Sequence, residues 1–195
     1  EWVYVFWFRS ITFAYLSAWR IGISRSKGNV LKNEMVWYTI IQITMLTAIF
    51  LTFSITGIVA FIGASITGWI MLETVQYIEH YGLARQKVNE YRYEDVNPKH
   101  SWNSNHQIGR AILFELSRHS DHHYLPHKDY VELDHHDNSP QLPTGYPGMM
   151  LISLIPPLYF YLVHKYNNYL SSKKLRGFEV QSDNNLRSLK QSYIQ

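Results

Sequence analysis

Residues 36–72 read VWYTIIQITMLTAIFLTFSITGIVAFIGASITGWIML and contain no charged side chain. A transmembrane helix needs about 20 consecutive apolar residues, so this run is long enough for two crossings. Gly57 is the expected break, which gives spans at 37–54 and 57–77. A hairpin buried in a soluble core is the alternative. The run favours an all-α, integral membrane protein built on a transmembrane hairpin.

The composition also favours a membrane protein. Charged residues make up 17% of the chain, against about 25% in an average soluble domain. Cysteine is absent, which excludes disulfides, iron–sulfur clusters and thiolate zinc sites, so any metal must be held by histidine and carboxylate. The net charge is only +3, and no basic run is interleaved with aromatic residues. We therefore expect no nucleic-acid partner.

Basic side chains flank the hairpin on both sides, whereas its turn has none. They are Arg20, Arg25, Lys27 and Lys32 before it, and Arg85, Lys87 and Arg92 after it. Because cytoplasmic loops of membrane proteins are enriched in lysine and arginine, both ends of the hairpin are expected in the cytoplasm. Residues 78–148, which follow the hairpin, then form a histidine-bearing helical cap on the cytoplasmic side.

The remaining segments complete a single, partial membrane domain over residues 1–195. The apolar residues 1–8 are expected to end a preceding membrane helix, and residues 9–32 to form an interfacial helix and a basic loop. Residues 149–163 contain Pro156 and Pro157 and are too short to cross the bilayer, so they predict an interfacial helix. A polar tail is expected over residues 164–195.

Three histidines are clustered in Arg118-His119-Ser120-Asp121-His122-His123. Their i, i+3, i+4 spacing places the imidazoles on one face of a helix, which we expect to run from about 104 to 123. Imidazole is a common ligand of iron, zinc and copper. His80 at the end of the second span is a further candidate, because ionisable groups at the membrane edge need a partner, a metal or water. The pair His135-His136 is instead expected in a solvated loop.

A histidine site beneath apolar helices suits a lipid-soluble substrate. It could hold iron for oxygen activation on an inert hydrocarbon chain, or zinc that activates water for hydrolysis. The residues alone leave both chemistries open.

Five stretches then resemble one family in their order along the chain. Residues 76–83, QYIEHYGL, closely resemble a signature of the membrane alkane monooxygenases. Three later stretches resemble further motifs of that family: SWNSNH at 101–106, LSRHSDHH at 116–123 and PQLPTGYPG at 140–148. An earlier motif resembles YLSAWR at 15–20, and the likeness extends to about Pro157. The box around His80 is specific to this family, whereas HxxHH occurs across the membrane desaturases and hydroxylases.

The resemblance implies a non-haem enzyme with two iron ions in a bacterial cytoplasmic membrane, with several membrane spans. It would use O2 and electrons from rubredoxin to convert medium- or long-chain alkanes to primary alcohols. The histidines that match the ligand motifs are His80, His119, His122 and His123. Residues that could support these ligands are Glu79, Asn105, His106 and Asp121. Candidates for the substrate pocket are Gly63, Gly68 and Trp69.

The first two histidine boxes of that family are missing and would precede Glu1. Since four histidines cannot saturate two irons, we expect the C-terminal part of a longer hydroxylase, inactive and incompletely metallated in isolation. The alternatives are a related fatty acid desaturase or aromatic side-chain hydroxylase, or a non-catalytic, truncated membrane fragment.

Overall fold

The computed structural model describes residues 1–166, and this part of the chain is helical. Within these residues the only β-type pairings are two isolated bridges, Lys87 with Tyr93 and Asn103 with Gln141. The all-α prediction is confirmed for this part of the chain. Two compact units are present, Glu1–Tyr77 and Ile78–Gln195.

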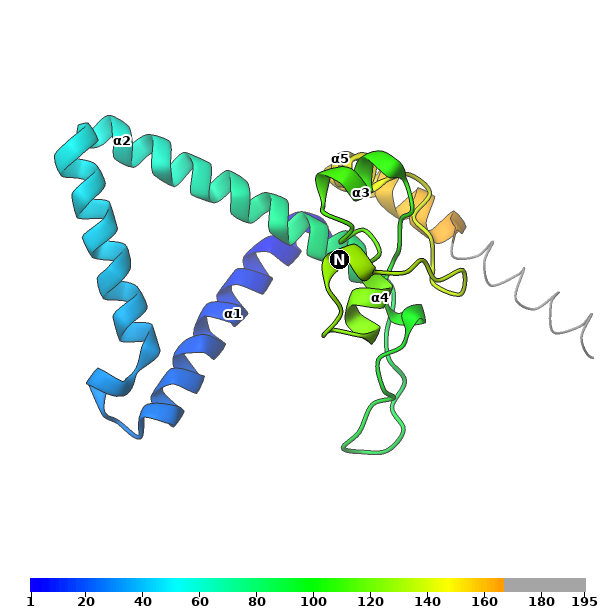
Figure 1. The fold of residues 1–195 in the computed structure, drawn as a ribbon, viewed down its shortest axis with the longest axis horizontal. Helices are drawn as coiled ribbons and strands as arrows, with labels where there is room; N and C mark the ends of the chain where they lie inside the picture. Colours follow the sequence, from blue (N-terminus) through cyan, green and yellow to red (C-terminus); the bar gives the residue numbers. More distant parts are fainter. Residues whose placement is uncertain (167–195) are drawn as a thin grey trace, which may run out of the picture. The chain divides into compact units, whose positions relative to one another are not determined.

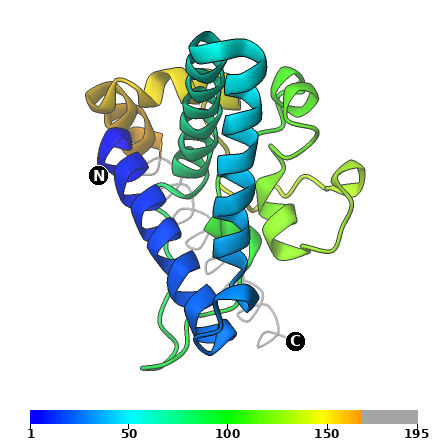
Figure 2. The ribbon, with the colours of Figure 1, turned by 90° about the vertical axis from the view of Figure 1, so that its left-hand side faces the viewer.

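The first unit begins with one long helix, α1 (Val3–Ser26). Lys27 and Gly28 adopt positive φ angles of 49° and 80°, and this left-handed turn ends the helix. The short 3-10 helix η1 (Val30–Lys32) then leads into α2 (Glu34–His80), as Figure 2 shows in blue to light blue. Residues 1–8 were expected to end a separate helix. The structure shows one continuous helix over Val3–Ser26, so no helix boundary falls at residue 8, and a membrane role for residues 1–8 stays a prediction.

Helix α2 bends sharply at Ser54, whose backbone angles are φ 58° and ψ −161°. Figure 1 shows the bend in the light-blue to cyan part of the ribbon. Gly57 lies one turn further on, where an added Cβ would come within 2.3 Å of the Cβ of Phe53. The predicted break therefore falls three residues too late. Gly57 supplies the space that the bend requires, and Ser54 takes the non-helical conformation.

Among residues 1–166, α2 is the one helix that is long and apolar enough to cross a membrane. Its most apolar window has a mean hydropathy of 2.2 and is not buried within the protein. An exposed apolar surface of this extent suits contact with lipid. The crossings at 37–54 and 57–77, and their orientation, stay predictions.

Two long-range hydrogen bonds connect the far end of α2 to α1 and to the residue at the start of the chain. The indole Nε1 of Trp7 donates to the hydroxyl of Thr74 at 3.1 Å. The hydroxyl of Tyr77 donates to the carbonyl of Glu1 at 2.6 Å. The first unit is thus closed at the end of α2 that leads towards His80.

The second unit consists of short helices joined by long irregular segments. Its elements are η2 (Pro98–His100), α3 (Gln107–Ile112), α4 (His119–Tyr124), η3 (Tyr130–Glu132) and α5 (Tyr146–Ser153). The single helix expected over 104–123 is wrong. Phe114 and Glu115 adopt positive φ angles of 49° and 61° between α3 and α4. Arg110 stabilises this reversal through two hydrogen bonds to the Glu115 carboxylate, at 2.7 and 2.9 Å.

The helix expected over 149–163 also divides. Helix α5 ends at Ser153, and a second helical stretch covers residues 156–166. Proline is favoured at the first position of a helix, so Pro156 and Pro157 begin a new helix rather than interrupt an old one. Residues 164–166 of the expected polar tail belong to this helix, and the rest of the tail lies outside the described residues.

Candidate metal centre

Three imidazoles meet in the second unit, from His80 at the end of α2 and from His119 and His123 on α4. Each offers one ring nitrogen, and these atoms lie within 4.8 Å of one another. The Nε2 atoms of His80 and His119 are 3.4 Å apart, across 39 residues of sequence. The ring centroids of His119 and His123 are separated by 4.3 Å. The spacing on α4 and the fold of the intervening chain together build the cluster.

The cluster favours the neutral form of imidazole. Burial, followed by the charges of the neighbouring imidazoles, lowers the pKa of His119 from 6.5 to about 2. Burial also lowers the pKa of His123, with the same kind of contribution from His80. Neutral imidazole is the form that binds a metal, since its lone pair is free.

The spacing of the nitrogens fits a shared metal ion. With metal–nitrogen bonds of about 2.1 Å, two ligands at a tetrahedral angle lie about 3.4 Å apart. The Nε2 atoms of His80 and His119 have this separation. A donor set of neutral nitrogens suits iron, zinc or copper. The residues present therefore fit a bound metal ion, as the sequence predicted. Their geometry does not distinguish between iron, zinc and copper.

His122 lies beside this group without belonging to it. Its ring centroid is 5.9 Å from that of His119 and 5.8 Å from that of His123. Its predicted role as a ligand stays a prediction.

Glu79 is buried against the cluster, with 3% of its surface exposed. Its Oε2 lies 3.2 Å from Nε2 of His119, whereas its Oε1 has no hydrogen-bond partner. Burial, followed by the charge of Glu79, raises the pKa of the Tyr146 hydroxyl. Glu79 thus lies beside the cluster, and its predicted role of supporting the ligands stays a prediction.

Asp121 was predicted to orient one of the clustered imidazoles, but its carboxylate has other partners. It is bound by His136 Nε2 at 2.7 Å, by Lys128 Nζ at 2.9 Å and by the Asp134 amide at 2.8 Å. Burial raises the pKa of Asp121, but the bonds from Asp134, Lys128 and His136 outweigh it and lower the pKa to about 2. Asp121 therefore fastens the segment after α4 to the helix.

The expectation that His136 lies in a solvated loop was wrong, since its ring binds a buried carboxylate. Nothing in the local sequence distinguishes His136 from His135, which pairs with the exposed Asp137. The one feature that could have predicted this contact was Asp121 itself, because a buried carboxylate needs cationic or N–H partners. Lys128, seven residues further on, is such a partner.

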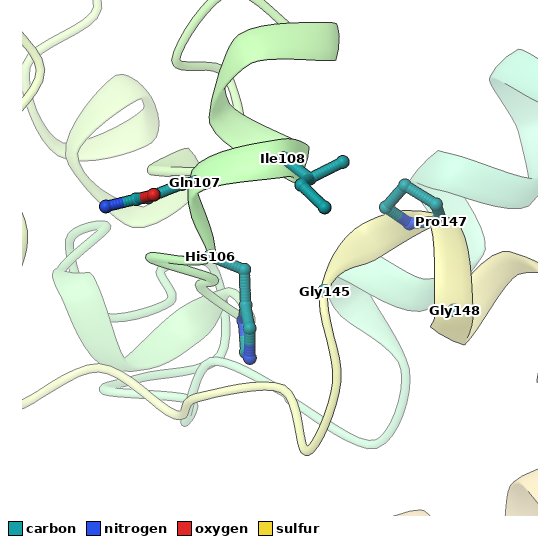
Figure 3. Close-up of a pocket in the computed structure, with 7 residues that line it drawn as sticks. His106, Gln107, Ile108, Gly145, Pro147 and Gly148 are labelled. Carbon is teal, nitrogen blue, oxygen red and sulfur yellow. The ribbon is translucent and has the colours of Figure 1, made fainter.

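The other two predicted supporting residues, Asn105 and His106, contact residues near the cluster and not the clustered histidines. Asn105 accepts hydrogen bonds from the Arg118 guanidinium, at 3.3 and 3.4 Å. His106 bonds the hydroxyl of Ser104 at 2.9 Å and lines a separate pocket between α3 and α5, opposite Gly145 and Pro147 (Figure 3). His127, which follows α4, is exposed.

A pocket adjoins the cluster and is lined by two of its imidazoles, those of His80 and His123. Leu83 and Val96 supply apolar walls, and Arg85 and His100 supply polar ones. The ring of His100 is itself engaged by Glu94, with Nε2 3.0 Å from Oε1. The cluster is therefore accessible to a small molecule from one side.

The predicted pocket residues of the second span lie in the first unit. Added Cβ atoms at Gly63 and Gly68 would meet nothing within 4 Å, and Trp69 is half-buried. Their role in binding a substrate stays a prediction.

Residues 1–153 match the sequence profile described as fatty acid desaturase. The chain belongs to the fatty acid desaturase family. It is 43% identical over 150 residues to alkane 1-monooxygenase 2 of Pseudomonas aeruginosa, covering 74% of this chain and 40% of that protein. It is 40% identical over 161 residues to alkane 1-monooxygenase of Ectopseudomonas oleovorans, covering 80% of this chain and 40% of that protein.

A more distant relative in the same family is the xylene/toluene monooxygenase hydroxylase component XylM of Pseudomonas putida. The identity is 28% over 125 residues, covering 59% of this chain and 32% of that protein. The resemblance drawn from the motifs is thus confirmed, and the alkane enzymes are more similar than the aromatic one. The chain spans about two fifths of the length of the alkane monooxygenases that it matches.

Proposed function

We propose that this family member acts, within its complete protein, as a membrane alkane 1-monooxygenase. The observation that carries the proposal is the cluster of His80, His119 and His123. These residues come from two motifs that resemble the alkane enzymes, and the fold places their nitrogens at metal-ligand spacing. The identity of about 40% to proteins named alkane 1-monooxygenase supports the same reaction.

The reaction consumes an alkane, O2, two electrons and two protons, and yields a primary alcohol and water. Iron held by such a site supplies the activation of O2 that this chemistry requires. Reduced rubredoxin is the proposed electron donor. Zinc-dependent hydrolysis is less well supported, because the named relatives are oxygenases.

The residues of this chain have distinct proposed roles. His80, His119 and His123 hold a metal ion, and His122 is a further ligand within reach of the same region. Glu79, whose Oε2 lies 3.2 Å from Nε2 of His119, balances the charge of a bound cation. Leu83 and Val96 keep part of the adjoining pocket apolar, which suits a hydrocarbon or O2.

The proposed setting is a bacterial cytoplasmic membrane. The spans at 37–54 and 57–77 would place the substrate candidates Gly63, Gly68 and Trp69 in the bilayer. The histidine cluster would then lie on the cytoplasmic side, where reduced rubredoxin is available. The basic residues on both sides of the hairpin support this orientation.

The test compares His119→Ala with His127→Ala in the protein expressed at its full natural length. We expect His119→Ala to lose bound iron and the conversion of octane to 1-octanol with rubredoxin and its reductase. His127→Ala should retain both, because His127 is exposed and lies outside the cluster. Unchanged iron and activity in His119→Ala would refute the proposed site.

The products separate this function from its alternatives. A desaturase would form an alkene, an aromatic side-chain hydroxylase would prefer toluene or xylene to octane, and a non-catalytic protein would form none of these products. Residues 1–195 expressed alone are expected to be inactive and to bind less iron than the longer protein. Full octane hydroxylation by that segment would contradict the proposal that further ligands are needed.

A further inference from the structure

A buried three-residue segment, Trp102-Asn103-Ser104, is hydrogen-bonded to both elements that supply the histidine cluster. We name residues 102–104 the bridging segment. Trp102 and Asn103 have no exposed surface, and Ser104 has 1%. The sequence placed this segment in a family motif without a role for its first two residues.

On one side, Trp102 binds the two peptide carbonyls that flank His80. Its backbone N–H donates to the Glu79 carbonyl at 2.8 Å, and its indole Nε1 donates to the Tyr81 carbonyl at 2.8 Å. Helix α2 ends at His80, so these carbonyls belong to the helix end that lacks intrahelical partners. One residue thus fixes the backbone on both sides of His80.

On the other side, Asn103 and Ser104 bind the chain around His119. The side-chain Oδ1 of Asn103 accepts from the Ser120 amide at 3.3 Å, and the Ser104 amide donates to the Ser117 carbonyl at 2.9 Å. Arg118, the N-cap of α4, makes no side-chain capping bond. Asn103 therefore satisfies an amide at the start of α4 that the local sequence leaves open.

The bridging segment is itself held on a third side. The Asn103 amide donates to the Pro140 carbonyl at 2.7 Å, and its own carbonyl accepts from the Leu142 amide at 2.8 Å. The Tyr146 hydroxyl donates to the Trp102 carbonyl at 3.0 Å. Because these contacts are buried, the segment cannot shift without breaking several hydrogen bonds at once.

We infer that Trp102 and Asn103 are positioning residues, which set the separation of His80 from His119 through the bridging segment. Neither residue is proposed to touch substrate or metal. The expected effect on metal affinity rests on the proposed function. The effect on the separation of His80 from His119 can be tested in the absence of metal.

The metal-free test uses thiol cross-linking. Because this chain has no cysteine, the pair His80→Cys and His119→Cys introduces its only two thiols, with any cysteine elsewhere in the complete protein replaced. The rate of cross-linking by a short bifunctional thiol reagent depends steeply on the separation of the two thiols. We expect Trp102→Phe and Asn103→Leu each to lower that rate by about tenfold.

Two control variants lose a similar bond elsewhere. Trp37→Phe removes an indole donor to the Leu31 carbonyl, at 2.8 Å, and Asn89→Leu removes an acceptor of the Tyr91 amide, at 3.0 Å. Their cross-linking rates should equal that of the parent. Trp102→Phe keeps the backbone bond to Glu79, and Asn103→Asp keeps the acceptor for Ser120. Asn103→Asp is therefore expected to restore the rate that Asn103→Leu loses.

The second measurement restores the histidines and titrates the complete protein with Co²⁺. If Trp102 and Asn103 are positioning residues, Trp102→Phe and Asn103→Leu should each weaken Co²⁺ binding by about tenfold or more. They should also shift the visible absorption bands of the bound Co²⁺. Cross-linking rates equal to the parent in both variants would overturn the inference. If the unmodified protein bound no Co²⁺, the proposed function would fail, while the cross-linking rates would still decide the role of the bridging segment.

Discussion

The Nε2 atoms of His80 and His119 lie 3.4 Å apart, although 39 residues separate them in the chain. One histidine ends a long apolar helix, and the other begins a helix of six residues. Since burial keeps His119 neutral, the two nitrogens can share a cation without first losing a proton. The contact therefore joins the last residue of α2 to the first residue of α4 within the second unit.

The adjacent residues His135 and His136 are expected to respond differently to substitution. His136→Ala should lower the free energy of unfolding by about 1.5 kcal/mol or more, because it removes a charge-assisted bond to the buried Asp121 carboxylate. His135→Ala should change it by less than about 0.5 kcal/mol, since its partner Asp137 is exposed. Thermal unfolding of the two purified variants measures the difference, and equal effects would contradict the role assigned to His136.

The reversed turn between α3 and α4 is expected to weaken in acid. The bonds from Arg110 lower the pKa of Glu115 below its ordinary value of 4.5, despite an opposing effect of burial. Because the folded-state pKa is the lower one, the ion pair contributes its full stability above about pH 4.5 and loses it as the pH falls through the folded value. The protection factors for amide hydrogen exchange over residues 113–118, which correct for the intrinsic pH dependence of exchange, should fall in that range.

The matched variant for this turn is Glu115→Gln, which removes the titrating group. It should lower the free energy of unfolding by about 1 kcal/mol near neutral pH and abolish the acid-dependent part of the exchange. Asp95→Asn disrupts the exposed pair with Arg92 and should leave the exchange unchanged. An identical acid response in Glu115→Gln would show that another group controls the turn.

Gly82 is expected to be sensitive to substitution because its φ angle of 73° turns the chain just after His80. Gly82→Ala should cost about 1–2 kcal/mol, as side-chain-bearing residues disfavour this conformation. Gly68→Ala provides the control, since a methyl group there meets nothing within 4 Å and the residue is helical. That variant should be unchanged or more stable by up to about 1 kcal/mol. Equal unfolding midpoints would contradict the argument.

Trp69 is a candidate residue of the substrate pocket, and the test of whether it limits the length of the alkane depends on the proposed function. In the complete protein, Trp69→Ala should admit longer alkanes by removing a large side chain from the second span. The products from octane, dodecane and hexadecane measure the change by gas chromatography. Leu51→Ala, at an exposed position of the same helix, should leave the product profile as it is. An unaltered profile in Trp69→Ala would indicate that the indole faces away from the pocket.

Local patterns in the sequence predicted the elements that depend on near neighbours. The uncharged run lies within α2, which is long and apolar enough to cross a membrane. The spacing of His119 and His123 placed both rings on one side of α4, since helical geometry alone fixes that relation. The motif around His80 predicted the family, which the comparison with related sequences confirmed.

The boundaries were less predictable, because they depend on contacts that a local pattern does not contain. The bend of α2 occurs at Ser54 rather than Gly57, and the helix expected up to His123 is interrupted at Phe114 and Glu115. In the second case the pairing of Arg110 with Glu115 stabilises positive φ angles that intrinsic preference disfavours. Tertiary and side-chain interactions outweighed helical propensity there.

By itself, the sequence determined the helical class, the apolar hairpin candidate, the family and the identity of the histidines that could bind metal. Only the tertiary structure decided which of them meet. It brought His80 to His119 and His123, left His122 beside them, and gave Asp121 to His136 instead of to a clustered imidazole. The reason is that periodicity fixes relations within one helix, whereas contacts between distant residues require a buried connection such as Trp102 and Asn103, whose hydrogen bonds exist only once the chain has folded.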